Sequence, residues 1–459
     1  MKRFGVEVNL KNIPCLDKEF MPILRFNRAF LETAEKPFSV AVERADGQMA
    51  TVHTRINGSE DMFEADCYYI ERLVKTILWM KGGYKIYVSG DEKIYNYLKE
   101  TYYAGGQQEF DWDYMANIFE KPFEVVLVDS VPEAKDAPKA MGGHLEGCRI
   151  GFDAGGSDRK VSAVVDGETV YSEEVVWFPK INSDPDYHYQ GILEAMKTAA
   201  SKMPRVDAIG ISSAGVYVDN RIMVASLFLK VSDEDFDKKV KNMYLDVCKE
   251  IGADIPVEVA NDGDVTALAG AMNLEDDSVL GVAMGTSEAV GYVDPNGNIT
   301  GWLNELAFAP VDFCKDAMVD EWSGDYGCGV KYFSQDGVIK LAPFAGIELD
   351  ESLSPAEKLK VVQGLMKEGD ERAAAIYDTI GAYFGYAIAF YAEFYDMKHV
   401  LIMGRVTSGD GGVILLERAQ EVLDTEFPEL AKKIQLHIPD EKARRVGQSV
   451  AAASLPKTK

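Results

Sequence analysis

Residues 148–157 read CRIGFDAGGS, and the fold follows from how this pattern recurs along the chain. Its apolar run predicts a buried strand, and the glycines after it predict a tight turn into a returning strand. The same order comes back at residues 279–293, where VLGVAM runs into GTS and then into EAVGYV. Helical and strand patterns alternate after each of these stretches. This repeated order indicates a two-lobed α/β molecule with its ligands at the carboxyl ends of strands, between the lobes.

Composition divides the chain near residues 130–147, where SVPEAKDAPKAMGGHLEG is rich in Pro, Ala, Gly and charge and predicts a linker. We expect an accessory α/β domain over residues 1–145, with a hairpin at Asp46-Gly47. A first lobe over 146–275 and a second lobe over 276–459 follow. The closing helix, at about residues 445–455, is expected to pack back on the first lobe.

The charge balance excludes several classes of protein. Lys and Arg number 48 and Asp and Glu 75, so the formal net charge is −27. Such a surface disfavours both nucleic acid and anionic membranes. The apolar stretch Thr379 to Ala392 is too short to span a bilayer and predicts a buried helix. Six scattered cysteines without a CxxC pair, and a first decapeptide without an apolar core, indicate a cytoplasmic protein with reduced thiols.

The turn after the first strand is a candidate phosphate site. Gly155 and Gly156 let backbone N–H groups approach an anion, and Ser157 adds a hydroxyl donor. Lys160 follows close by and can pair with phosphate. Asp153, at the end of the strand, suits a water bound to Mg²⁺. The alternative is an ordinary hairpin turn that happens to contain two glycines.

Two later turns extend this hypothesis. Gly285-Thr286-Ser287 follows the second strand, as suits the other side of a phosphate chain. Glu288 comes next, and a carboxylate there repels phosphate unless it points away or meets the metal. Gly404 opens a glycine loop after a third strand, where an adenine ring can lie flat against backbone. Each of these stretches is by itself also compatible with a generic turn.

Asn261-Asp262 ends one strand and opens a helix, which makes Asp262 a candidate general base. A carboxylate facing a bound hydroxyl accepts its proton as the oxygen attacks a γ-phosphate. Asn261 can then hydrogen-bond a neighbouring hydroxyl of the same substrate. The alternative is that Asp262 is only a helix cap.

Taken in order, these stretches resemble the superfamily of actin, sugar kinases and acetate kinases, and within it the ROK family of sugar kinases and related repressors. DAGGS stands where that family has its first phosphate motif, DxGGT. The similar segments cover about residues 147–455, or two-thirds of the chain, and they are 257–271, 279–301, 399–409 and 446–455. The resemblance implies two ribonuclease-H-like lobes with a cleft between them, ATP and Mg²⁺ as cofactors, a sugar as the acceptor, and a homodimer.

By the same resemblance, Asp262 matches the catalytic base, and Asn261 and Glu305 match sugar ligands, although Glu305 can also be a plain surface acid. Phe308 stands where the family has a histidine that binds both the sugar and a structural zinc. The family's zinc loop, CxCGxxGC, is EWSGDYGC here, so Glu321 and Ser323 replace its first two cysteines and only Cys328 remains. We therefore expect no structural zinc, because a tetrahedral site needs four ligands, and a loop held by packing, through Trp322 and Tyr326.

The second phosphate turn also departs from the family's GTGxGGG, since several glycines are missing from GTSEAVG. Either the turn is strained or it has another shape, and Lys160 or Arg159 can offset the lost donors. The leading hypothesis is an ATP-dependent sugar kinase with an accessory domain that is not the winged helix of the repressors. The alternatives are a non-catalytic sugar or nucleotide sensor on the same scaffold, and an activator ATPase that binds a metal cluster through cysteines.

Overall fold

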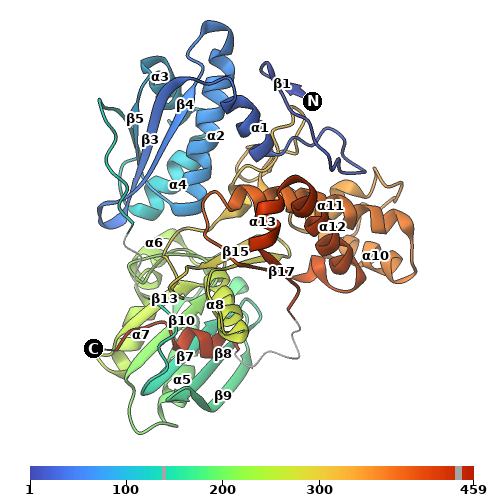
Figure 1. The fold of residues 1–459 in the computed structure, drawn as a ribbon. Helices are drawn as coiled ribbons and strands as arrows, with labels where there is room; N and C mark the ends of the chain where they lie inside the picture. Colours follow the sequence, from blue (N-terminus) through green and yellow to red (C-terminus); the bar gives the residue numbers. More distant parts are fainter. Residues whose placement is uncertain (137–140, 440–446, 459) are drawn as a thin grey trace. The chain divides into compact units, whose positions relative to one another are not determined.

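The computed structural model describes residues 1–136, 141–439 and 447–458 (Figure 1). The chain forms two compact units. Unit 1 comprises Met1–Ala137, Val282–Val290 and Trp302–Ile438, and unit 2 comprises Pro138–Gly281, Gly291–Gly301 and Pro439–Lys459. Part of the predicted linker, residues 137–140, and the start of the predicted closing helix, residues 445–446, lie outside the described residues. The three-domain division stays a prediction.

A five-stranded sheet organises the described part of unit 2, in the order β13-β10-β7-β8-β9. Its strands β7, β10 and β13 are parallel, and β8 and β9 extend it antiparallel through a hairpin at Asp166-Gly167. The strands of this unit are β7 (Cys148–Ala154), β8 (Asp158–Val165), β9 (Glu168–Val176), β10 (Ala208–Ser213), β11 (Val216–Val218), β12 (Arg221–Val224) and β13 (Val257–Asn261). Its helices are α5 (Pro185–Ala200), α6 (Asp233–Asp235), α7 (Met243–Ile251), α8 (Asp262–Leu274) and α14 (Gln448–Ala453).

Both faces of this sheet are covered by packing. Ile150 and Phe152 of β7 pack into a core with Ile192 of α5 and Val247 of α7. Alternate residues of a strand face opposite sides, so Gly151 faces the other way, against α14. A Cβ there would lie 1.7 Å from the carbonyl oxygen of Ser449, so α14 packs directly on the strand backbone.

One predicted helix of unit 2 is wrong in its extent. The pattern of residues 235–252 predicts a continuous helix, but the structure has α6, a π-helical turn η5 (Phe236–Val240) and then α7. The carbonyl oxygen of Lys241 accepts a hydrogen bond from the amide of Ile222 in β12, at 2.9 Å. That backbone bond to a strand replaces the helical one, so the helix is interrupted where β12 meets it.

The first part of unit 1 is the predicted small α/β layer, built on the sheet β4-β3-β5-β6. The hairpin at Asp46-Gly47 is confirmed, because β3 and β4 pair antiparallel from Lys36↔Ile56 to Arg44↔Gln48. Helices α2 and α3 pack against this sheet. The elements are β1 (Lys2–Arg3), β2 (Val6–Glu7), α1 (Ile23–Leu31), β3 (Lys36–Arg44), β4 (Gln48–Ile56), α2 (Phe63–Lys81), β5 (Lys85–Ser89), α3 (Glu92–Thr101), α4 (Glu109–Phe119) and β6 (Glu124–Leu127).

The rest of unit 1 surrounds a second sheet of the described residues, in the order β15-β14-β16-β17. Its strands are β14 (Val279–Met284), β15 (Glu288–Val293), β16 (His399–Met403) and β17 (Gln435–His437), and residues 282–290 of the first two belong to this unit. The helices are α9 (Gln335–Leu341), α10 (Pro355–Lys367), α11 (Glu371–Tyr391), α12 (Asp410–Glu426) and α13 (Pro428–Lys433). The apolar stretch predicted to be a buried helix lies in α11, which is buried from Thr379 to its end at Tyr391.

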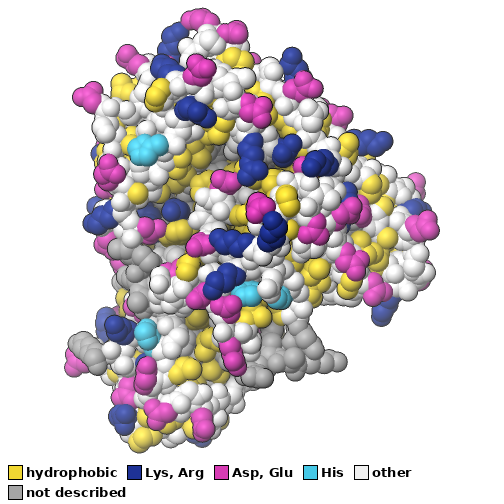
Figure 2. Space-filling view, viewed as in Figure 1, with side chains coloured by type: hydrophobic (Ala, Val, Ile, Leu, Met, Phe, Trp, Pro, Cys, Tyr) yellow, Lys and Arg dark blue, Asp and Glu magenta, His cyan; other side chains and the backbone are white. Residues whose placement is uncertain are grey.

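The visible surface carries both signs of charge. Figure 2 shows lysines and arginines scattered among aspartates and glutamates rather than gathered on one side of this face. Among the described residues, no helix is both long and apolar enough to cross a membrane.

Candidate functional site

The carboxyl ends of three parallel strands of unit 2 bring predicted site residues together. In the register of the sheet, Asp153 of β7 lies opposite Ser212 of β10, and Asn261 of β13 lies opposite Ser213. Asp262 follows directly, as the first residue of α8. Parallel strands all end at one edge of a sheet, which is where α/β proteins place their ligands.

Asp153 is a half-buried carboxylate anchored by its neighbour. Ser212 Oγ donates a hydrogen bond to Asp153 Oδ1 at 2.8 Å. Burial raises the pKa of Asp153 to about 6; the charge of Asp262 adds to this effect, whereas the hydrogen bond from Ser212 and the charge of Lys160 oppose it. The carboxylate therefore stays ionised at neutral pH and becomes protonated in mild acid.

The helix cap at this edge is Asn261 rather than Asp262. Asn261 Oδ1 accepts from the amide of Gly263 at 2.7 Å, and its Nδ2 donates to the carbonyl of Gly215 at 2.7 Å. A primary amide has two N–H groups and two acceptor lone pairs, so one of each remains for a ligand. The structure thus assigns the capping role to Asn261, and the alternative that Asp262 is the helix cap is wrong.

Asp262 itself is half-buried at the start of α8. Burial raises the pKa of its carboxyl, and the N–H groups of the first helical turn and the charge of Lys180 oppose this rise. A general base works best when its pKa lies near the working pH, so a raised pKa makes this carboxylate a better base at neutral pH.

Close packing fixes the start of α8. A Cβ on Gly291 of β15 would lie 2.1 Å from the carbonyl oxygen of Gly263, so strand and helix meet backbone to backbone. The amide of Tyr292 donates to Asp264 Oδ1 at 3.0 Å. From α14, Gln448 Nε2 donates to the carbonyl of Asp262, at 3.0 Å. The position of Asp262 is therefore set from two sides.

The turn between β7 and β8 presents the predicted phosphate donors. Trp177 Nε1 donates to the carbonyl of Gly155 at 2.7 Å and holds the turn, while Gly156 and Ser157 are exposed. Lys160 lies opposite Asp153 in the β7–β8 ladder, with its Nζ 3.6 Å from both Asp158 and Glu174. Arg159, the other cation expected to offset lost donors, is buried and paired with Glu194 at 3.0 Å.

Lys180 is a site residue that the sequence did not reveal. A Cβ on Gly156 would lie 2.7 Å from Lys180 Cε and 3.0 Å from its Nζ, so this ammonium group lies over the glycine turn. Its charge also acts on Asp262. Lys180 follows the turn by 24 residues and belongs to no motif, so no pattern in the sequence places it there.

The second predicted phosphate turn belongs to unit 1. The amide of Gly285 donates to the carbonyl of Ser287 at 3.0 Å, and the carbonyl of Gly285 accepts from the amide of Gln335 at 2.9 Å. No residue from Gly285 to Gly291 has a positive φ. The missing glycines thus leave a turn of another shape rather than a strained one, with Thr286 and Ser287 exposed.

Gly404 directly follows β16, at a point where glycine is required. Its φ is +97°, and a Cβ would lie 2.3 Å from the carbonyl oxygen of Met284. The backbone after β16 is therefore pressed against the strand that leads into Gly285. Any larger residue would separate the two.

Glu288 points into the interior of unit 1 instead of toward a ligand at the exposed Thr286 and Ser287. It is 3% exposed, and neither carboxyl oxygen has a hydrogen-bond partner. Burial, reinforced by the charge of Glu305, raises the pKa of Glu288 to about 8. It therefore holds a proton at neutral pH, which removes the expected repulsion of phosphate.

Glu305 and the loop that aligns with the family's zinc loop also lie in unit 1. The amide of Glu305 donates to the carbonyl of Trp79, at 2.9 Å. Phe308 packs with its ring centroid 4.4 Å from that of Trp79 and 5.2 Å from that of Trp322, and Cys328 is fully buried. Trp322 and Tyr326 were both predicted to hold this loop: Trp322 contacts Phe308 with a ring that is 63% exposed, and the Tyr326 ring lies 5.1 Å from the guanidinium of Arg72.

The predicted residues divide between the two units. Those of unit 2 are Asp153, Gly155, Gly156, Ser157, Lys160, Asn261 and Asp262, and those of unit 1 are Gly285, Thr286, Ser287, Gly404 and Glu305. The cleft expected between lobes stays a prediction.

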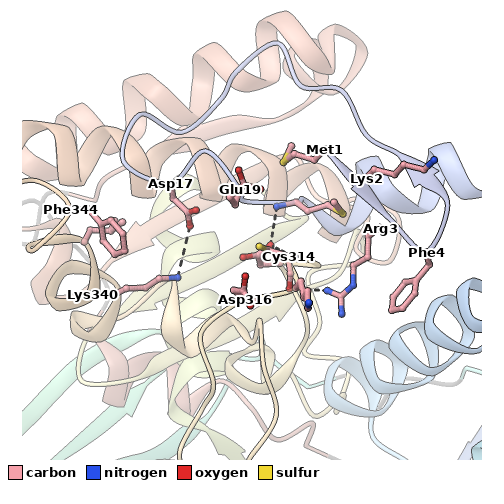
Figure 3. A pocket seen from close by; sticks show the side chains of 15 residues that line it. Met1, Lys2, Arg3, Phe4, Asp17, Glu19, Cys314, Asp316, Lys340 and Phe344 are labelled. Atoms are coloured by element: carbon pink, nitrogen blue, oxygen red, sulfur yellow. Dashed lines mark hydrogen bonds and ion pairs between the residues drawn. The ribbon is translucent and has the colours of Figure 1, made fainter.

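Unit 1 also contains a cavity of about 800 Å³ that none of these residues lines. Asp17 and Lys340 face each other across it, with Nζ 4.0 Å from Oδ2, and Arg3 reaches the carbonyl of Cys314 at 2.8 Å (Figure 3). Asp312 forms part of its wall, where Tyr332 donates to it at 2.6 Å. Asp17, Lys340, Arg3 and Asp312 thus already have partners within the protein.

Solved structures share this fold. A ROK hexokinase from Thermus thermophilus superposes with a TM-score of 0.50 at 18% identity, covering 67% of this chain and 97% of that one. A ROK family transcriptional regulator, a homologue of the E. coli MLC protein, gives 0.50 at 18% identity, covering 68% and 79%. No protein-family model and no curated protein matches the sequence. The chain has the mixed α/β fold of ROK sugar kinases and regulators, which confirms the predicted fold class.

Proposed function

We propose that the protein is an ATP-dependent sugar kinase, which transfers the γ-phosphate to a hydroxyl of a hexose or amino sugar. One observation carries the proposal: Asp262 starts α8 at the carboxyl edge of the sheet, half-buried, with a raised pKa and with its capping role taken by Asn261. A positioned carboxylate with a raised pKa suits a general base.

In the proposed reaction, the acceptor hydroxyl gives its proton to a carboxylate oxygen of Asp262 as its own oxygen bonds to the γ-phosphorus. The bond from that phosphorus to the bridging oxygen of ADP breaks, and ADP leaves with the bonding electrons. Glu305 and the remaining amide hydrogen of Asn261 orient the acceptor. Holding acceptor and phosphate in line supplies much of the rate enhancement.

We propose that the phosphates lie against backbone of the two turns. The proposed phosphate contacts are Gly155, Gly156, Ser157 and Lys160 at the first turn and Gly285, Thr286 and Ser287 at the second, and the proposed adenine contact is Gly404. Lys180, over Gly156, adds a second cation beside Lys160. Cations on the phosphates stabilise the charge that spreads over them during transfer.

The residues at this edge fit a magnesium ion held largely by water and phosphate. Mg²⁺ prefers carboxylate oxygens and keeps several waters, and Asp153 offers a carboxylate that is still ionised above pH 6. Within the described residues, no group of three or more His, Cys, Asp or Glu side chains is arranged to hold a metal. When bound, Mg²⁺ would neutralise phosphate charge.

The test measures sugar-dependent release of ADP from Mg-ATP over a panel of hexoses and amino sugars. We expect Asp262→Asn to lower kcat by about 10²–10⁴-fold and to leave nucleotide binding intact. Glu250→Gln, an exposed acid of α7, is the matched control and keeps wild-type turnover. Wild-type turnover by Asp262→Asn would mean that the base is misassigned.

A non-catalytic sensor of sugar or nucleotide is the second candidate. It is favoured by the altered shape of the turn at 285–291 and by the aromatic packing of Phe308, the position of the missing sugar-binding histidine. A sensor would show thermal stabilisation by a sugar or nucleotide with no ADP released. Sugar-dependent ADP release would eliminate it.

A further inference from the structure

Helix α2 buries charged side chains in its middle, which is costly unless each one is paired. Glu71, Arg72 and Lys75 are all 1% exposed or less. Lys75 Nζ lies 2.8 Å from Asp111 Oδ2 of α4. A further partner of this helix, Asp325, is 253 residues from Arg72 in the chain. Helix α2 thus has an ionic connection to a distant loop of unit 1.

The bond from Arg72 to Asp325 is bidentate. Arg72 Nη1 donates to Asp325 Oδ2 at 2.9 Å, and Nη2 donates to Oδ1 at 3.2 Å. Lys75 Nζ lies 3.1 Å from the same carboxylate, and Gln108 Nε2 donates to it at 3.2 Å. The fork of two parallel bonds fixes orientation as well as distance, so this loop has one allowed position on α2.

Electrostatics keep this bond charged. Burial acts to raise the pKa of Asp325, but Arg72 and Lys75 together outweigh it and hold the pKa below its usual value. Well-packed apolar residues often stabilise a protein as much as a buried ion pair does. A desolvated, bidentate pair is therefore better explained by the single arrangement it selects than by stability.

The end of the same helix contacts the segment that carries Glu305. The last carbonyls of a helix lack partners within it, and here those of Trp79 and Met80 accept from the amides of Glu305 and Asn304, each at 2.9 Å. Asn304 is held at a φ of +52°. Tyr395 Oη also donates to Asn304 Oδ1, at 3.0 Å. The backbone of the Glu305 segment is thus docked on α2.

Aromatic rings connect these two attachments. Trp79 of α2 and Phe110 of α4 pack on Phe308, with ring centroids 4.4 and 5.6 Å away. Trp322, three residues before Asp325, packs on Phe308 at 5.2 Å and on Phe110 at 5.5 Å. The segment 304–308, the loop 320–328 and the helices α2 and α4 therefore form one packed body.

We propose that helix α2 is the positioning element of the acceptor site: its Arg72–Asp325 bond and its terminal carbonyls set the place of Glu305. This rests on the proposed function for the role of Glu305, but the docking of the segment does not. The proposal gives residues 1–136, which include α2, a role in acceptor binding. Arg72 and Asp325 are positioning residues, since they act through the backbone of another segment.

The experiment compares Asp325→Asn with wild type by amide hydrogen exchange over residues 302–308, and by KM for acceptor and for ATP. The control is Lys85→Met, which removes a partly exposed ion pair with Glu124 (2.7 Å) elsewhere in the same sheet layer. A milder variant, Lys81→Met, removes a cation 4.1 Å from the ring of Trp302 and remains informative if Asp325→Asn fails to fold.

We expect Asp325→Asn to speed exchange at 302–308 about tenfold, with a smaller effect for Lys81→Met and none for Lys85→Met. Acceptor KM rises by a similar factor while ATP KM stays within about twofold. Unchanged exchange in both α2-contact variants overturns the docking, whatever the protein catalyses. Faster exchange with an unchanged acceptor KM overturns the link to the acceptor site. If no sugar is turned over, exchange still decides the docking, and the proposed function fails separately.

Discussion

Glu288 makes a prediction whose sign and size follow from its surroundings. The carboxyl is 3% exposed, lacks any hydrogen-bond partner and has its pKa raised from 4.5 to about 8. Between these two values the folded protein keeps the proton and the unfolded chain releases it. The folded state therefore binds more protons, and this group costs stability progressively as pH rises from 4.5 to 8. At pH 7 the cost is about 3 kcal/mol, at about 1.4 kcal/mol per pH unit.

Glu288→Gln removes the titration and keeps the shape. Its buried amide carries a desolvation cost of about 1–3 kcal/mol, but that cost does not change with pH. We therefore expect the free energy of unfolding of the variant to gain on wild type by about 1.4 kcal/mol per pH unit between pH 5 and 8. Urea unfolding at pH 5, 6, 7 and 8 measures the difference, with Glu250→Gln as the exposed control. Parallel stability curves for Glu288→Gln and wild type would refute the buried, protonated carboxyl.

Three further predictions concern packing, charge and acidity. Arg72→Met leaves Asp325 buried without its main partner and should lower the free energy of unfolding in urea by about 3–5 kcal/mol. Adding Asp325→Leu should recover part of that stability, and additive losses from the two substitutions would contradict the coupling. Gly210→Ala places a Cβ 1.7 Å from a carbonyl oxygen of α14 and should lower Tm, whereas Gly364→Ala, in open space on α10, should gain up to about 1 kcal/mol. Calorimetry should show Mg-ATP affinity falling below pH 6 as Asp153 takes up its proton, and a pH-independent affinity would count against its role.

Local patterns predicted much of the fold because each depends on residues close in sequence. The strand ending in Asp153, the hairpin at Asp46-Gly47 and the strand-to-helix junction at Asn261-Asp262 are all where the sequence indicates. The sequence suggested only Asp262 as a possible cap of the helix, although an Asn can cap a helix equally well. Only the geometry shows that Asn261 takes that role.

The features that the sequence did not reveal all depend on contacts between residues far apart in the chain. The bond between Arg72 and Asp325 joins positions 253 apart, and both residues look like ordinary surface charges in a helical pattern and a loop. Lys180 reaches the glycine turn because the chain folds back after Trp177. The helix expected over residues 235–252 is interrupted by a hydrogen bond from β12. None of these has a local pattern to read.

The most direct test of the central claim looks at the product. The protein is incubated with a sugar panel and Mg-ATP whose γ-phosphate carries heavy oxygen, and the sugars are analysed by mass spectrometry. The account predicts one labelled sugar phosphate, formed in a one-to-one ratio with ADP and lost in Asp262→Asn. ADP formed with labelled free phosphate but no sugar phosphate, or sugar phosphate formed equally by Asp262→Asn, would contradict it.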